Sequence, residues 1–241
     1  MATLHLIRHA QASMFAADYD QLSPLGEQQA RTLGVVLAER MLAGRRPGFD
    51  AVYTGPAKRQ RDTATLVGEA FLARGLAFPE PIVLPGANEH DGQRLVLGVL
   101  AQGTHAHELG VLAERAADPS GDKRQRSRQW QTIYEAVMRR WLIGEVAVEG
   151  HESWPEFHAR VREAYAQLRG EARGEAALFT SVGPKSVILH ELLAIPAAQA
   201  FELGWRIYNT AITRIVHSGA RATLDGFNEV AHLPLDQWTH R

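Results

Sequence analysis

Hydrophobic positions along this chain follow two patterns. Short apolar runs of the kind that form buried strands alternate with longer segments, in which apolar residues recur roughly every three or four positions, as on one face of a helix. The short runs predict strands at residues 3–8, 49–53, 81–84, 176–181, 211–217 and 220–229.

The boundaries of several helices carry their own signals. Ser23 and Pro24 are residue types preferred at the N-cap and at the first helical position, and Gly44 ends the run that follows them. Ser153 and Glu156 form a capping box, in which each side chain can bond the backbone N–H of the other. Other helices are predicted at 57–72, from 183 through Ile195, and around 95–100, 109–115 and 129–141, with 117–128 as a polar loop.

The order of these elements indicates the fold class. Strands that alternate with helices are typical of a mostly parallel sheet with helices on both faces. We therefore predict a three-layer α/β fold. A length of 241 residues suits one domain of this class, so we assign residues 1–241 to a single domain.

Composition and charge exclude several functions. The chain has no Cys, which rules out disulfides, thiolate metal sites and a thiol nucleophile. A formal net charge of −1 gives no general attraction to nucleic acids or anionic membranes. The N-terminus lacks a signal-peptide pattern, and no run approaches the ~18 apolar residues of a membrane span. We therefore expect a cytoplasmic protein without a nucleic-acid or membrane partner.

Polar residues that follow the predicted strands are the candidates for chemistry, because open α/β sheets bind ligands beyond the carboxyl ends of their strands. Arg8 and His9 follow the first strand, Arg59 comes shortly after the second, and Glu89 follows the third. The strand at 176–181 leads directly into a predicted helix N-terminus. These positions are expected to meet at one edge of the sheet.

Residues of these types fit a phosphoryl group. Guanidinium forks match phosphate oxygens, and a helix N-terminus favours an anion. A neutral His can act as a nucleophile, and a carboxyl group can protonate a leaving alkoxide. We expect the neighbouring arginines to hold the pKa of His9 below its reference value of ~6.5.

Several segments of the chain, in this order, resemble the motifs of one family. Leu6–Ala10 is similar to an Arg-His-Gly signature, and Thr54–Ala64 is similar to Ser-Pro-Leu-x-Arg-Ala-x-x-Thr-Ala. Asn88–Glu89 is similar to the segment with an acidic proton donor. Glu152–Ser153 with Arg160–Val161 is similar to a Glu-Ser…Arg-Val stretch, and Thr180–Gly183 falls at the place of Ser/Thr-His-Gly. Together they resemble the histidine phosphatase superfamily, the phosphoglycerate mutase-like proteins.

The resemblance implies a role for each matching position. His9 would be the nucleophile that becomes phosphohistidine, and Arg8 and Arg59 would bind the phosphoryl group. Glu89 would act as general acid and then as base for water. No metal or organic cofactor is implied, and the partner is a small phosphorylated substrate. The residues expected to line the substrate site are Gln11, Ser13, Ser181, Val182 and Gly183.

Two positions depart from the family pattern. Ala10 replaces Gly, and Val182 stands where the family has its second His. Losing one such hydrogen-bond donor typically costs ~10²–10³ in rate, or about 2.7–4 kcal/mol, although Ser181 or the Gly183 N–H can partly compensate. We therefore expect weak or specialised phosphomonoester hydrolysis, or mutase-like transfer. The alternative is a non-catalytic phosphate-ester-binding protein on the same fold.

Some assignments remain open at the level of the sequence. Arg61 competes with Arg59, and His90 or Asp91 can share or replace the role of Glu89. We interpret residues at about 85–150 as an insertion over the site, which decides substrate identity and whose Trp-containing helices are a candidate homodimer surface. Other charged groups there are the basic cluster Lys123, Arg124, Arg126 and Arg128, interpreted as solvated, and His105, His107 and Glu108, whose spacing is poor for a metal site.

Overall fold

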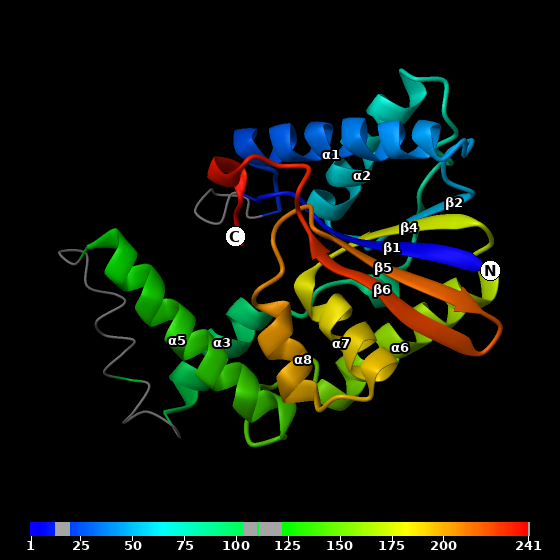
Figure 1. The fold of residues 1–241 in the computed structure, drawn as a ribbon. Helices are drawn as coiled ribbons and strands as arrows, with labels where there is room; N and C mark the ends of the chain where they lie inside the picture. Colours follow the sequence, from blue (N-terminus) through cyan, green and yellow to red (C-terminus); the bar gives the residue numbers. More distant parts are fainter. Residues whose placement is uncertain (13–19, 104–109, 111–121, 241) are drawn as a thin grey trace. The chain divides into compact units, whose positions relative to one another are not determined.

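The computed structural model describes residues 1–12, 20–103, 110 and 122–240 (Figure 1). These residues form two compact units, 1–89 with 160–241, and 90–159, each described here by itself. None of the helices in the described ranges combines the length and apolar character needed to cross a bilayer. Ser13, His105, His107 and Glu108 lie outside the described residues.

A six-stranded sheet forms the centre of the first unit, in the order β3-β2-β4-β1-β5-β6. The four strands from β3 to β1 run parallel, whereas β5 is antiparallel to both β1 and β6. This confirms the predicted α/β class with its mostly parallel sheet. The strands are β1 (Ala2–Arg8), β2 (Ala51–Thr54), β3 (Ile82–Val83), β4 (Glu175–Thr180), β5 (Ile212–Ser218) and β6 (Arg221–Glu229).

Helices flank this sheet. In Figure 1, α1 and α2 lie on one face, and α7 and α8 lie on the other. Because β4 lies between β2 and β1, all of its residues are buried, as expected of a central parallel strand. The helices and helical turns of this unit are α1 (Pro24–Ala43), α2 (Lys58–Leu72), η1 (Pro85–Ala87), the part of α6 (Trp154–Glu171) from residue 160, α7 (Val182–Leu193), α8 (Ala197–Gly204) and η2 (Leu235–Gln237).

The second unit contains α3 (Gly92–Gln102), α5 (Lys123–Leu142) and the start of α6. Trp141 is 2 % exposed, packs against Phe157 and donates its indole N–H to the carbonyl of Glu152 at 3.1 Å. It is therefore a core residue of its unit. Two statements about residues of about 85–150 stay predictions. They are that this segment covers the site and that it mediates a homodimer.

Two predicted boundaries were wrong. Residues 123–128 belong to α5 rather than to a polar loop, because Lys, Arg and Gln are good helix formers even without an apolar face. In addition, α7 ends at Leu193, and Ile195 lies outside it. Ala194 adopts a left-handed conformation with φ 51°, and Pro196 disfavours helical geometry at Ile195 and precedes α8. The helix expected at 109–115 falls outside the described residues except for Gly110.

The start of α1 positions the chain that follows β1. The Ser23 hydroxyl caps the helix by accepting the Gly26 N–H at 3.0 Å, as predicted. The backbone after His9 crosses α1 at Gly26, where an added Cβ would lie 2.0 Å from the carbonyl oxygen of Gln11. Gly26 is therefore required by a close backbone approach.

We expect Gly26→Ala to destabilise the protein by about 1–3 kcal/mol or more, because the Gln11 backbone must move away from the helix. Urea unfolding monitored by circular dichroism measures the effect. The matched control is Gly170→Ala in α6, where nothing lies within 4 Å of an added Cβ; here helix propensity predicts a gain of up to about 1 kcal/mol. Equal stability of the two variants would contradict this account of Gly26.

Candidate functional site

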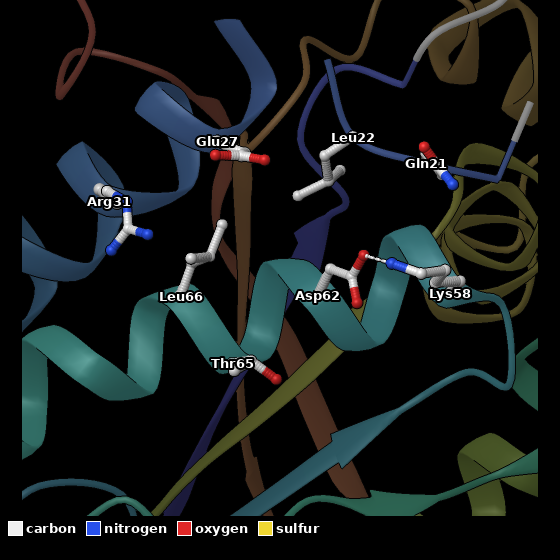
Figure 2. Close-up of a pocket in the computed structure, with 8 residues that line it drawn as sticks. All are labelled: Gln21, Leu22, Glu27, Arg31, Lys58, Asp62, Thr65 and Leu66. Carbon is white, nitrogen blue, oxygen red and sulfur yellow. Dashed lines mark hydrogen bonds and ion pairs between the residues drawn. The ribbon is translucent and has the colours of Figure 1, made fainter. Parts of the chain in front are cut away.

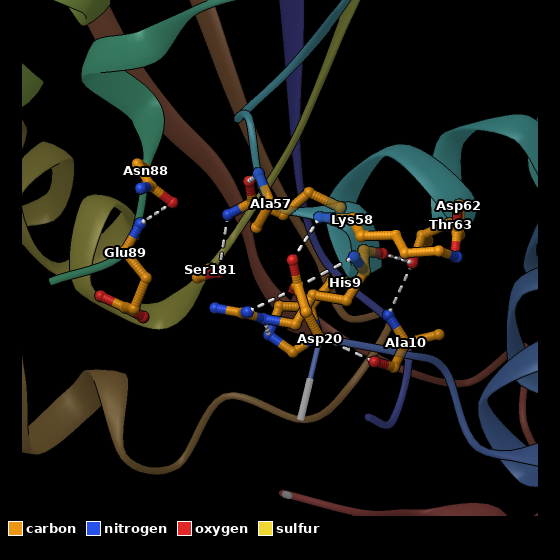
Figure 3. Close-up of polar contacts among 12 residues, drawn as sticks. His9, Ala10, Asp20, Ala57, Lys58, Asp62, Thr63, Asn88, Glu89 and Ser181 are labelled. Carbon is orange, nitrogen blue, oxygen red and sulfur yellow. Dashed lines mark hydrogen bonds and ion pairs between the residues drawn. The ribbon is translucent and has the colours of Figure 1, made fainter. Parts of the chain in front are cut away.

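The candidate site lies where β1, β2 and β4 end. His9 follows β1, Arg59 lies in the first turn of α2 after β2, and Ser181 is the N-cap of α7 after β4. Glu89 follows η1. Figure 3 shows His9 and Asp20 together with Glu89 and Ser181, which come from other elements. The parallel order of these strands is what places their carboxyl ends at one edge.

Hydrogen bonds define the tautomer of His9. Its Nδ1 lies 2.8 Å from the carbonyl oxygen of Ala10, which can only accept, so Nδ1 carries the ring proton. On the other side of the ring, the Arg59 Nε–H donates to His9 Nε2 at 3.3 Å. The lone pair of the imidazole is therefore on Nε2 and faces a guanidinium group.

The environment of His9 keeps its ring neutral. The residue is only 5 % exposed, and this burial lowers its pKa well below 6.5. The positive charges of Arg59 and then Arg8 lower the pKa further, against a smaller opposite effect of the bond to Ala10. The expected effect of the arginines is confirmed in direction, but burial is the larger cause. A neutral imidazole with an unprotonated Nε2 has the form that nucleophilic attack requires once the Arg59 contact is replaced.

Arg59 is buried at 8 % exposure and forms an ion pair with a residue that the sequence analysis missed. Its Nη1 lies 2.7 Å from Oδ1 of Asp20. The same carboxylate accepts the backbone N–H of Lys58 at 2.7 Å and that of Arg59 at 3.3 Å (Figure 3). By contrast, the competing Arg61 is exposed, so Arg59 is the arginine of this helix that reaches His9.

Arg8 is also buried, and its guanidinium binds backbone carbonyls. Its guanidinium donates to the carbonyl of Ile207 and, at 2.6 Å, to that of His240. The structure thus places this cation next to His9 along the chain and ties it to the C-terminal segment. Binding of a phosphoryl group by Arg8 stays a prediction.

Three side chains that were not predicted hold the backbone around His9. The Ala10 N–H donates to Thr63 Oγ1 at 3.0 Å, which fixes the chain to α2. Asn209 donates from Nδ2 to the carbonyl of His9 at 3.1 Å. Lys185 is fully buried, and its Nζ lies 3.0 Å from the carbonyl oxygens of Leu6 and Ala211. Burial, followed by the charge of Arg8, lowers the pKa of Lys185 well below its ordinary value.

Glu89 meets the N-terminus of α7. Its Oε2 accepts the backbone N–H of Gly183 at 3.0 Å, where the helix dipole favours negative charge. Arg160 fixes the chain before Glu89 by donating from Nη1 to the carbonyls of Gly86 and Asn88 at 3.0 and 2.9 Å. The Gly183 N–H proposed as a substitute donor is thus bound by Glu89 in this structure.

The remaining predicted lining residues have structural partners. Ser181 Oγ accepts from Gln60 Nε2 at 2.8 Å, which links α7 to α2. Val182 is half-buried and lies close to Gly204 of α8, where an added Cβ would be 3.0 Å from Val182 Cγ1. Gln11 directs its side-chain oxygen to the Ser23 hydroxyl at 2.8 Å, at the start of α1.

The two alternatives to Glu89 belong to the second unit and are engaged there. The ring of His90 lies 5.2 Å from that of Trp141 and 5.3 Å from that of Phe157. Asp91 is the N-cap of α3 and accepts the Arg94 N–H at 3.0 Å. Among the three candidates, Glu89 is the one that contacts the helix N-terminus after β4.

A depression between the start of α1 and α2 is separate from the contacts around His9. It contains two acidic and two basic side chains, so it offers no net positive charge to an anion. By contrast, the groups around His9 are mainly cations and N–H donors, which favour an anion over a metal ion. The residues that line the depression are Gln21, Leu22, Glu27, Arg31, Lys58, Asp62, Thr65 and Leu66 (Figure 2).

Comparisons with known proteins establish the family. The chain belongs to the histidine phosphatase superfamily (branch 1), whose family model matches residues 4–91 and 101–230. No curated protein matches the chain. Solved structures, however, share its fold over nearly the whole length.

Three of these structures illustrate the range. A phosphoserine phosphatase mutant from Entamoeba histolytica, in complex with phosphoserine, is 18 % identical with a TM-score of 0.59, covering 97 % of this chain and 100 % of that one. Mycobacterial glucosyl-3-phosphoglycerate phosphatase with inorganic phosphate is 22 % identical with a TM-score of 0.60, covering 97 % and 100 %. Phosphoglycerate mutase from Bacillus anthracis is 14 % identical with a TM-score of 0.60, covering 96 % and 94 %. At these identities the likeness establishes the fold alone.

We expect the pKa of His9 to lie well below 6.5, with the proton of the neutral ring on Nδ1, because burial and two cations oppose protonation. Long-range ¹H–¹⁵N NMR of the histidine rings reports both the tautomer and the pKa. Arg59→Met removes one cation and should raise the pKa of His9, but not to 6.5, since burial is the larger cause. A proton on Nε2, or a pKa that does not respond to Arg59→Met, would contradict the described geometry.

Proposed function

We propose that this protein hydrolyses phosphomonoesters through a phosphohistidine at His9. The observation that carries the proposal is the neutral imidazole whose Nε2 lone pair faces the buried guanidinium of Arg59. Such a pair provides a nucleophile and a ligand for phosphate oxygens at the same point. Membership of the histidine phosphatase superfamily supports this chemistry.

Two steps complete the reaction. In the first, His9 Nε2 attacks phosphorus, the ester P–O bond breaks, and Glu89 gives its proton to the leaving oxygen. In the second, water attacks the phosphohistidine, Glu89 takes the proton from the water, and inorganic phosphate leaves His9. Arg59 and Arg8 stabilise the charge on the phosphoryl oxygens during both transfers. Substrate must replace the contact between Arg59 Nε and His9 Nε2.

The rate of this reaction is expected to be low. Val182 offers no polar group at the position of the family's second His, and the Gly183 N–H is bonded to Glu89. Removal of one donor to a developing oxyanion typically costs ~10²–10³ in rate. The protein is therefore a weak or specialised catalyst in this proposal.

The substrate is a small phosphorylated molecule in this proposal. Phosphoserine phosphatase, glucosyl-3-phosphoglycerate phosphatase and phosphoglycerate mutase share the fold, so the fold is compatible with both hydrolysis and transfer. Mutase-like transfer requires that a second acceptor reach phospho-His9 before water does. We favour hydrolysis, because the absence of the family's second His, in our interpretation of Val182, argues against efficient mutase-like transfer. The alternative is a protein that binds phosphate esters without turnover. The following experiment distinguishes this alternative from hydrolysis.

We expect slow turnover of an aryl phosphate between about pH 5 and 8 that disappears in His9→Ala, because the nucleophile is lost. Acid quenching during turnover, followed by mass spectrometry, should find an acid-labile phosphate on His9 of the wild-type protein. Turnover equal in the two proteins would reject the catalytic proposal. Tight phosphate binding without turnover would instead identify the protein as a binder.

Restoring the missing donor should accelerate the reaction. We expect Val182→His to raise kcat by at least about tenfold, since one such donor is worth ~10²–10³ in related sites. Val182→Leu is the matched control, because it changes the packing against Gly204 without adding a donor. A wild-type kcat at the level of the histidine variant would show that Val182 does not limit the rate.

A further inference from the structure

Asp20 connects two parts of the site that are distant in sequence. Its Oδ1 pairs with Arg59 Nη1 at 2.7 Å, and its Oδ2 accepts the Lys58 N–H at 2.7 Å. Oδ1 also lies 3.3 Å from the backbone N of Arg59. One carboxylate therefore holds both the backbone and the side chain of Arg59.

The edge of the guanidinium that Asp20 uses matters for chemistry. Nη1 lies on the side of the guanidinium away from the Nε–H. An ion pair through Nη1 therefore leaves the Nε–H to bind a different partner. In this structure Nε donates to His9 Nε2 at 3.3 Å. The pair with Asp20 thus fixes the rotation that turns the Nε edge towards the nucleophile.

The N-cap residue of the helix that carries Arg59 is Ala57, which has no polar side-chain atom, and α2 has no acidic residue in its first turn. The Gln60 side chain accepts the Ala57 N–H at 3.1 Å, but the N–H groups of Lys58 and Arg59 need an acceptor from outside the helix. Asp20 supplies that acceptor from a separate segment. The capping hydrogen bonds fix the position of the Asp20 carboxylate, and the carboxylate in turn fixes the position of the Arg59 guanidinium.

We propose that Asp20 is a positioning residue, which holds Arg59 with its Nε edge towards His9 Nε2 and so prepares the phosphoryl site. Asp20 does not touch the reacting atoms and acts through Arg59. The proposal rests on the proposed function for its catalytic consequence, but the arrangement of Asp20, Arg59 and His9 can be tested without turnover. Without Asp20, Arg59 loses the ion pair that holds its Nη1 edge, so its Nε edge is less firmly held towards His9.

Asp20→Asn separates the two roles of the carboxylate. The single amide oxygen of Asn can still accept the Lys58 N–H, so most of the helix cap and of the melting temperature should be preserved. The charge that holds Arg59 is lost, and we expect kcat/KM for an aryl phosphate to fall at least about tenfold, with a higher KM. Asp62→Asn is the matched control. It removes a carboxylate that belongs to α2 itself and pairs with Lys58 rather than with Arg59 (Figure 2). It should stay within about twofold of wild type.

Two readouts do not depend on catalysis. Titration calorimetry with inorganic phosphate should give a Kd at least about tenfold weaker for Asp20→Asn than for Asp62→Asn. NMR titration should show a higher pKa for His9 in Asp20→Asn, because a cation that lowers the pKa has moved away. A purely structural role of Asp20 would lower the melting temperature and leave both quantities unchanged in the folded protein.

The outcomes are distinct. Tighter phosphate binding by Asp20→Asn would overturn the proposal, because Asp20 would then compete with phosphate for Arg59. Values equal to those of Asp62→Asn in all readouts would also overturn it. If the wild type shows neither turnover nor phosphohistidine, the proposed function fails. The positioning role is then decided by phosphate affinity and by the pKa of His9 alone.

Discussion

The contact between a buried guanidinium and an uncharged imidazole is the constraint on which this site depends. Burying a cation without a partner is costly, and the N-terminus of a helix disfavours positive charge, so the carboxylate of Asp20 offsets both effects on Arg59. Arg59 can then lie buried beside His9, where its charge lowers the pKa of the imidazole. In the proposed reaction, the charge that would face a phosphoryl group is thus already in place, as electrostatic preorganisation requires.

Several contacts hold the backbone around His9 in place. Thr63 ties the next residue to α2, Asn209 holds the carbonyl of His9, and Lys185 joins the end of β1 to the start of β5. Each of these groups comes from a different segment of the chain. The backbone around His9, the proposed nucleophile, is therefore fixed from several directions by groups that do not themselves need to react, whereas the bond from Nδ1 to the Ala10 carbonyl sets the tautomer of the ring.

Local signals in the sequence predicted most of the elements and the central candidates, because strand patterns, caps and strand-end positions depend on neighbouring residues. Ser23, Gly44 and the capping box at Ser153 lie where these signals place them. Asp20 was missed because its role depends on a contact 39 positions away. Lys185 was missed because nothing local shows that a polar residue within α7 reaches two strand-end carbonyls. The end of α7 at Leu193 was missed although Pro196 carried the signal.

The clamp formed by Arg160 has a consequence for how this family can diversify. Arg160 binds the carbonyls just before Glu89, and residues 90–159 form a compact unit between these two points. Residues 90–159 therefore leave and re-enter the sheet-containing unit next to the backbone that Arg160 holds. The length and sequence of this segment can change without moving Glu89, the proposed proton donor, because insertions are tolerated where chain ends lie close together. Residues 90–159 can therefore be exchanged as one module while the sheet edge that carries the proposed phosphate chemistry keeps its geometry.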